Sequence, residues 1–345
     1  MGTFEDVRYR EKCRFCQTVV NVAMSITAIH DQEIPPSTKV ELFFKSFGKS
    51  GPSCLDICLA TSNQFTGRSR IMKSVNIFPE YQSTFGTDAC SHLPLVGEFP
   101  LWATVKESLE AWRSSHEQCS KTQDLALPVN AIVIDIEERK LVDAKLLYAA
   151  LSYVWGPPTL DDRLQATSET IKQLRQPGSL LNSRMPKTIE DAITVCKHLG
   201  ERYLWVDRLC IVQDDADSKH SQIAAMATIF ESAVLVIVAA SGDDMESGLP
   251  GVTSRRVVAQ NLHHLGGMTL VNSLTPLTLA IEHASWYSRA WTYREAVFAR
   301  RKLYLTAEQV FFECRKEVVS EDSFTTIGTM WKATINDILH TQRMQ

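Results

Sequence analysis

The sequence predicts an α/β protein in which helices flank a parallel sheet, with an additional region at the N-terminal end. From about residue 127 to residue 315, short apolar runs alternate with segments whose apolar residues recur at helical spacing. The run at 234–240, V-L-V-I-V-A-A, is apolar without a break, as expected for a strand covered on both faces. The first 125 residues or so lack this alternation and are rich in Ser, Thr and Pro. Strand, helix and strand in repetition favour a doubly wound sheet.

The boundary between the two regions is predicted from a helical pattern at 101–116 that a polar stretch at 114–124 interrupts. We expect an N-terminal region of unknown role at 1–110 and an α/β domain at 111–315. Residues 316–345 are expected to form a C-terminal tail with a helical piece.

The α/β region opens with β structure. Two apolar stretches, 131–136 and 141–147, predict a hairpin, and 148–154 predicts a buried strand that ends at W-G-P-P. A short helix is expected at 168–174. The clearest helix is 188–199, with Thr188 three residues before Asp191 as in a capping box and a glycine after its last residue.

The remaining elements continue the alternation. We expect strands at 203–207, 234–240, 302–306 and 310–314, and helices at 218–232 and 287–300.

Composition excludes several classes of protein. The 345 residues carry a net charge of -4, which gives no electrostatic reason to expect nucleic acid or an acidic membrane as partner. The run at 234–240 is too short to span a bilayer, and the N-terminus M-G-T-F-E-D is unlike a signal peptide. A cytoplasmic location follows as the expectation. The nine cysteines are expected to be thiols, and the CxxC formed by Cys13 and Cys16 matches no standard zinc module, so no metal site is predicted.

Polar and glycine residues follow three of the predicted strands. Because ligands bind beyond the carboxyl ends of parallel strands, candidate ligand-binding residues lie there. They are Trp155, Gly156, Gln213, Asp214 and Gly242, and Asp207 is a candidate catalytic residue. Each has a structural alternative: a tryptophan packs, and an aspartate caps a turn or faces solvent.

The segment R-A-W-T-Y-R-E at 289–295 sets Glu295 four residues after Trp291 on a predicted helix face. A carboxylate beside large aromatic side chains is partly desolvated unless a cation pairs with it, and Arg289 and Arg294 could do so. Glu295 is therefore either half of a structural ion pair or a catalytic residue.

Three long motifs are similar to those of the fungal heterokaryon-incompatibility (HET) domain. They are Y-A-A-L-S-Y-V-W-G at 148–156, L-W-V-D-R-L-C-I-V-Q-D-D at 204–215, and R-A-W-T-Y-R-E at 289–295. M-P-K-T-I-E-D-A-I at 185–193 and A-A-S-G followed by G-L-P-G-V within 239–252 also fit. The resemblance covers about residues 110 to 315.

The resemblance implies a fold like that of Toll/interleukin-1 receptor (TIR) domains, which is a flavodoxin-like parallel sheet. TIR domains that cleave NAD carry a glutamate four residues after a tryptophan, so Glu295 is the implied catalytic residue and NAD the implied substrate, with no cofactor. Asp207 would orient the ribose or its loop, and Trp155, Arg289 and Trp291 would help to bind the ligand. Where the family usually reads W-T-x-Q-E, this sequence has Arg294, which stabilises the carboxylate or blocks a cationic ligand.

The role implied by the family is non-self recognition that ends in programmed cell death. Self-association, and contact with other incompatibility or NLR-type signalling proteins, are the implied partnerships. The alternative to an NAD glycohydrolase is a self-associating adaptor without catalysis.

Overall fold

The computed structural model divides the chain into two compact units. The first comprises residues 1–95 and 259–275, and the second comprises 96–258 and 276–345. The residues that the structure describes are 2–30, 34–46, 53–63, 67–79, 95–115, 131–144, 147–157, 163–181, 184–256, 260, 262–265, 268–272, 274–288, 295, 297–315 and 318–323. The helix expected in the C-terminal tail lies outside them.

The first unit is built on an antiparallel sheet with the order β1-β2-β3-β4-β11-β10. Its strands are β1 (Gly2–Thr3), β2 (Lys39–Ser46), β3 (Ser53–Asn63), β4 (Gly67–Pro79), β10 (Leu262–Leu265) and β11 (Met268–Asn272). The last two strands come from a distant part of the chain, and β11 pairs with β4 so that Met268 is opposite Pro79. The pairing of β11 with β4 was not predicted, because the two strands lie far apart in the sequence.

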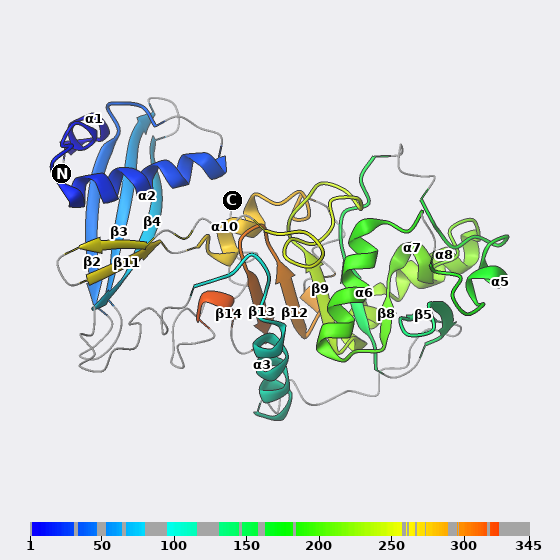
Figure 1. Cartoon of the computed structure of the whole chain (residues 1–345). Helices are drawn as coiled ribbons and strands as arrows, with labels where there is room; N and C mark the ends of the chain where they lie inside the picture. The colour runs from blue at the N-terminus through cyan, green and yellow to red at the C-terminus, as the bar shows by residue number, and fades with distance from the viewer. Residues whose placement is uncertain are drawn as a thin grey trace. The chain divides into compact units, whose positions relative to one another are not determined.

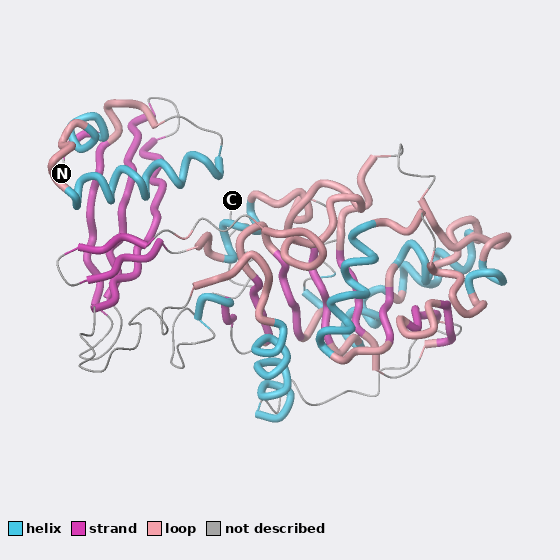
Figure 2. The backbone as a smooth tube through the Cα atoms, viewed as in Figure 1, coloured by secondary structure: helices cyan, strands magenta, loops and turns pink. Residues whose placement is uncertain are grey.

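Two helices accompany this sheet. Helix α1 (Phe4–Arg8) begins with a capping box between Thr3 and Asp6. Helix α2 (Arg14–His30) lies across the strands (Figure 2) and contacts β3 and β4. The apolar side chains of a small core hold the helices to each other and to the sheet: Phe4, Val7, Cys16, Val19, Val20, Ala23 and Val40.

The second unit has an eight-stranded mixed sheet with the order β14-β13-β12-β9-β7-β8-β5-β6. Its strands are β5 (Ile132–Asp135), β6 (Lys140–Asp143), β7 (Ala149–Ser152), β8 (Tyr203–Trp205), β9 (Leu235–Ala239), β12 (Arg301–Leu305), β13 (Val310–Cys314) and β14 (Val318–Ser320). The four central strands are parallel to one another, whereas the outer strands run antiparallel to their neighbours. The sheet is thus mixed, not wholly parallel, because short links such as 136–139 and 306–309 can join only antiparallel strands.

The helices of the second unit are short apart from two. They are α3 (Trp102–Ser115), α5 (Ile171–Leu174), α6 (Lys187–Leu199), α7 (Asp207–Cys210), α8 (Ala216–Ala224), α9 (Met226–Ser232) and α10 (Leu277–Glu282), and the 3₁₀ turn η3 (Glu321–Ser323) follows β14. Several of them lie beside the strands in Figure 1. No helix in the described part of the chain is long and apolar enough to cross a membrane.

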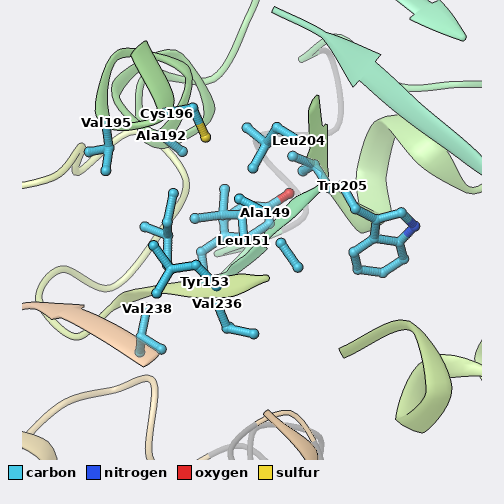
Figure 3. Packing of buried hydrophobic residues seen from close by; sticks show 14 of the residues in the cluster. Ala149, Leu151, Tyr153, Ala192, Val195, Cys196, Leu204, Trp205, Val236 and Val238 are labelled. Atoms are coloured by element: carbon cyan, nitrogen blue, oxygen red, sulfur yellow. The ribbon is translucent and has the colours of Figure 1, made fainter. Parts of the chain in front are cut away.

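Helices α6 and α9 cover opposite faces of the parallel strands. Leu204 and Trp205 are consecutive in β8 and point in different directions (Figure 3). Trp205 makes an edge-to-face contact with Phe230 of α9, with ring centroids 5.5 Å apart. Cys196 of α6 lies on the other side of the strands, in the same buried cluster (Figure 3). Burial on both faces explains the unbroken apolar run of β9.

The carboxyl ends of the parallel strands form one edge of the sheet. Chain order along the parallel strands is β7, β8, β9, β12, but their spatial order is β8, β7, β9, β12. The direction of winding therefore reverses between β7 and β9. In open α/β sheets, such a reversal leaves a crevice at the carboxyl edge in which ligands bind.

Three expectations about local structure need correction. Helix α3 packs on α6, where Trp102 stacks on His198 with ring centroids 4.9 Å apart, so the second unit begins at residue 96 instead of near residue 110. The expected helix at 218–232 is two helices, α8 and α9, that meet at Ala225. The capping box predicted at Thr188 is absent, because Pro186 is the N-cap residue and makes no side-chain cap.

Candidate functional site

A buried hydrogen-bonded chain joins Trp286, Ser152 and Glu295 at the carboxyl edge of the sheet. The indole Nε1 of Trp286 donates to the Oγ of Ser152 over 2.7 Å. The Ser152 hydroxyl in turn donates to Oε2 of Glu295 in a very close contact. The exposed fractions of Ser152, Trp286 and Glu295 are 1%, 2% and 7%. Glu295 is thus held inside the protein, against the last residue of the central strand β7.

The direction of each hydrogen bond in this chain is fixed by chemistry. An indole N–H can only donate, so the Ser152 oxygen is its acceptor. A serine hydroxyl has one hydrogen, which leaves the carboxylate of Glu295 as the group that accepts it. Trp286 is itself held by an edge-to-face contact with Tyr304 of β12, with ring centroids 6.1 Å apart. One carboxylate oxygen of Glu295 is thus oriented by Ser152 of β7, and Ser152 is held by a tryptophan that packs on β12.

A second carboxylate at the same edge, Asp207, is bound by a different tryptophan. Nε1 of Trp155 lies 2.9 Å and 3.1 Å from the two carboxylate oxygens of Asp207. The backbone N–H of Arg208 donates to Oδ1 of Asp207 over 2.7 Å. The guanidinium of Arg208 lies over the Trp155 ring, 5.1 Å from its centroid, in a cation–π contact. The structure therefore brings two of the predicted site residues, Trp155 and Asp207, into direct contact.

Glu295 and Asp207 share this edge through the pairing of β7 with β8. Ala150 of β7 is opposite Trp205 of β8 in the parallel register. Ser152, which binds Glu295, and Asp207 each follow two residues later in the chain. Both carboxylates thus lie at the carboxyl ends of adjacent strands: Asp207 follows β8, and Glu295 binds the last residue of β7.

Two other predicted ligand-binding residues hold backbone groups of neighbouring loops. The side-chain amide of Gln213 donates to the carbonyl oxygens of Asp207 and Ile211, over 3.0 Å in each case. Asp214 is exposed, and its Oδ1 accepts the backbone N–H of Ser168 over 2.7 Å. The contact of Asp214 fits its structural alternative, an aspartate that caps a turn or faces solvent.

The glycine-rich loop after β9 is fastened to the start of α6. Asp191 is fully buried and accepts hydrogen bonds from the Leu249 N–H, over 2.7 Å, and from the Thr253 hydroxyl, over 2.6 Å. The Gly248 N–H donates to the Thr188 hydroxyl over 3.1 Å. Thr188 and Asp191, which the sequence suggested as a cap, thus hold a loop that belongs to the same edge of the sheet.

Gly242 opens that loop and has a positive φ of 88°. A Cβ atom at this position would lie 2.3 Å from the Cβ of Ser247, so only glycine fits without a shift of the loop. Gly156, after β7, is exposed and also has a φ of 88°. Both glycines allow sharp turns where β7 and β9 end. Arg289, Trp291 and Arg294 lie outside the described residues.

The prediction missed Ser152 and Trp286. Ser152 ends an otherwise apolar buried strand, A-A-L-S, and a hydroxyl in that position requires a hydrogen-bond partner. That requirement was a signal available in the sequence. No local signal named the partner, because Trp286 and Glu295 follow 134 and 143 residues later.

The described residues contain no group of three or more His, Cys, Asp or Glu side chains that could hold a metal ion.

Comparison with known families bears on these same residues. Residues 148–295, which run from the start of the β7 motif to Glu295, match the heterokaryon incompatibility protein (HET) family model. The segment belongs to the HET family.

One curated relative supports this assignment. The chain is 22% identical over 231 residues to heterokaryon incompatibility protein 6, OR allele, of Neurospora crassa. The match covers 55% of this chain and 32% of that protein, so the chain spans about a third of the length of this relative. No solved structure gives a significant match. The HET segment holds both carboxylates, Asp207 and Glu295, and both of the tryptophans, Trp155 and Trp286, that contact them directly or through Ser152.

Proposed function

We propose that this chain acts in fungal heterokaryon incompatibility, and that its HET domain triggers cell death by cleaving the N-glycosidic bond of NAD. Glu295 is the proposed catalytic residue. The observation that carries the proposal is the position of Glu295, which is buried at the carboxyl edge of the sheet and oriented by the Ser152 hydroxyl.

The topology of the second unit also supports the proposal. Numbered along the chain, the parallel strands have the spatial order 2-1-3-4, which is shared with flavodoxin-like folds. TIR domains that cleave NAD have a fold of this class. The winding reverses between β7 and β9, and Ser152 ends β7. We therefore include a TIR-like fold of the domain in the proposal.

The reaction would need few groups. Nicotinamide is cationic while it is attached to the ribose and leaves as a neutral ring, so no acid has to protonate it. The ribose then passes through an oxocarbenium-like state, as in glycoside hydrolysis. A fixed carboxylate stabilises that positive charge, most effectively where water is excluded. Ser152 and Trp286 would act as positioning residues that keep the carboxylate of Glu295 in place.

Asp207 has a different role in this scheme. Its carboxylate is engaged by Trp155 and by the Arg208 N–H. It would therefore set the position of the Trp155 ring, which forms a wall of the ligand site, instead of touching the substrate.

A non-catalytic adaptor that self-associates is the second candidate, and one observation favours it. Glu295 is only 7% exposed and is tied to Ser152, which is also how a structural carboxylate is held. In that case the carboxyl edge would serve assembly and not chemistry.

The two candidates differ in nicotinamide release. Purified protein at high concentration is expected to release nicotinamide from NAD, and Glu295→Gln is expected to lower the rate by about 100-fold or more, the scale seen when one preorganised electrostatic group is removed. Glutamine can still accept a hydrogen bond from Ser152, so we expect the melting temperature to change little. Glu282→Gln, an exposed glutamate on α10, is the matched control and should keep full activity.

Release at an equal rate by the Glu295→Gln variant would remove Glu295 from the mechanism. If the unmodified chain releases no nicotinamide but forms oligomers that the Glu295→Gln variant also forms, the adaptor is the correct function.

A further inference from the structure

Two cysteines lie at the start of α2 in the N-terminal unit, outside the HET domain: Cys13 immediately precedes the helix, and Cys16 is its third residue. The motif C-R-F-C places them three residues apart, and both thiols are free. Cys13 is exposed, whereas Cys16 is 2% exposed and belongs to the core of the unit. One sulfur of the pair is thus accessible from solvent and the other is shielded behind it.

Cys13 takes the place of a helix-capping residue. It immediately precedes Arg14, the first residue of α2, and its Sγ accepts the Cys16 backbone N–H over 3.4 Å. An N-cap oxygen normally accepts this bond from the third helical residue. A thiolate there also faces the positive end of the dipole of a long helix.

The backbone around Cys13 holds the sulfur in this position. Its N–H donates to the Arg10 carbonyl over 2.9 Å, and its carbonyl accepts the Gln17 N–H over 3.0 Å. The Gln17 side chain binds the carbonyl of Arg8, the last residue of α1, over 3.3 Å. The turn between α1 and α2 is thereby fixed on both sides of the cysteine pair.

The environment makes the two thiols unequal. Hydrogen bonds from the Cys16 thiol and backbone lower the pKa of Cys13. The hydrogen bond to Cys13, followed by burial, raises the pKa of Cys16. A more acidic exposed thiol beside a less acidic buried one suits thiol–disulfide exchange, in which the first attacks and the second resolves.

Three cysteines of the second unit provide a contrast. Cys196, Cys210 and Cys314 are buried. Burial raises the pKa of the Cys210 thiol to about 12, and it raises that of Cys196 as well. None of these three has the exposure that a reactive thiol needs.

We propose that Cys13 and Cys16 form a redox-active dithiol that exchanges with low-molecular-weight disulfides such as oxidised glutathione. The Cys13 thiolate attacks one sulfur of the glutathione disulfide: a mixed disulfide between Cys13 and glutathione forms, the original S–S bond breaks, and one glutathione leaves as a thiolate that takes up a proton. Cys16 then loses its proton and attacks Cys13, which expels the second glutathione. Two protein thiols are oxidised to one disulfide, and one glutathione disulfide is reduced to two glutathione thiols. This activity is independent of the chemistry proposed for Glu295.

The geometry of the first turn permits the internal disulfide. Residues three apart at a helix start have Cβ atoms about 5–6 Å apart, and a disulfide requires about 3.5–4.5 Å. A small movement of Cys13, the residue outside the helix, closes this difference. The disulfide would replace the hydrogen bond that Cys13 now makes to the first turn of α2.

The test treats the folded full chain with glutathione buffers of rising oxidised fraction, quenches with acid, blocks remaining thiols and maps peptides by mass spectrometry. The unmodified chain should form a Cys13–Cys16 disulfide. The Cys16→Ser variant should accumulate glutathione on Cys13, because the resolving thiol is missing. The Cys13→Ser variant should leave Cys16 unmodified, because its sulfur is buried. Cys196, Cys210 and Cys314 serve as internal controls that stay unmodified.

The rate at which iodoacetamide alkylates Cys13 is a second test, and it requires no variant. In the unmodified folded chain, Cys13 should react with iodoacetamide at neutral pH several-fold faster than in the urea-unfolded chain. A slower or equal rate would overturn the proposal. So would a Cys16→Ser variant that folds but gains no glutathione on Cys13, or equal labelling of Cys16 in the Cys13→Ser variant.

Discussion

Two carboxylates lie at the carboxyl edge of one sheet, and a tryptophan orients each of them in a different way. Trp155 donates directly to Asp207, which is half-buried and also accepts the N–H of the next residue. Trp286 reaches Glu295 only through the hydroxyl of Ser152, and all three groups are buried. Similar residue types thus make a direct contact between the ends of two adjacent strands in one case, and a contact relayed through a serine in the other.

The difference indicates which of the two carboxylates is held in place at a cost in folding free energy. Asp207 is bound to a backbone group one residue away, which any aspartate at the start of a helical turn can do. Burying Glu295 has a desolvation cost, and Ser152 is well placed to offset part of it. Costs of this kind are common at functional sites.

The largest expected effect comes from Ser152→Ala. The variant leaves the Trp286 N–H without its described acceptor and removes a donor from the Glu295 carboxylate, both in buried surroundings. We expect the free energy of unfolding to fall by about 2–4 kcal/mol, because unsatisfied buried polar groups cost about 1–3 kcal/mol each. Chemical unfolding measures the change.

A control for that prediction is Ser247→Ala. This serine is exposed, and its hydroxyl donates to the side chain of the nearby Asp244 over 2.9 Å. Its loss should cost less than about 0.5 kcal/mol. Equal effects at Ser152 and Ser247 would show that the buried chain of hydrogen bonds contributes nothing to stability.

A smaller effect is expected from Asp207→Ala. The Trp155 and Arg208 N–H groups lose their acceptor, but water can replace it at a half-buried position. We expect a loss of about 1–2 kcal/mol and faster hydrogen exchange at the Arg208 amide. Asp207→Asn keeps one acceptor oxygen and should lose less than half as much. A loss as large as that of Ser152→Ala would remove the contrast between the two carboxylates.

The smallest effect is the coupling between the two sites. The hydrogen bonds described for Ser152 share no residue with those described for Asp207. Ser152→Ala and Asp207→Ala should therefore be additive within about 0.5 kcal/mol in a double-mutant cycle of unfolding free energies. A coupling beyond about 1 kcal/mol would mean that both carboxylates belong to one network.

Local patterns predicted most elements of the second unit, because each depends on burial that the sequence itself displays. The apolar run of β9 and the apolar face of α6 with its terminal Gly200 are examples, and Gly200 does adopt the left-handed conformation at the end of the helix. Pairing over long distances was not predictable in this way. The join of β11 to β4 depends on strands far apart in the chain.

The residues of the candidate site also differ in how far the sequence could predict them. Trp155 and Asp207 could be predicted as neighbours, because adjacent parallel strands end at one edge. Trp286 could not, since a tryptophan outside any regular element gives no periodic signal. The roles of Thr188 and Asp191 were misread, because a side chain that binds a distant loop has the same local sequence as one that caps its own helix.

The hairpin of β10 and β11 has a consequence for how this chain is made. A ribosome synthesises β4 long before residue 272, so β4 waits with an unpaired edge while most of the second unit emerges. The N-terminal sheet can complete itself only after β9 has left the ribosome. Deletion of the first 95 residues alone would leave the β10–β11 hairpin without β4, the strand that it pairs with. A variant that lacks the whole unit must therefore also lack residues 259–275.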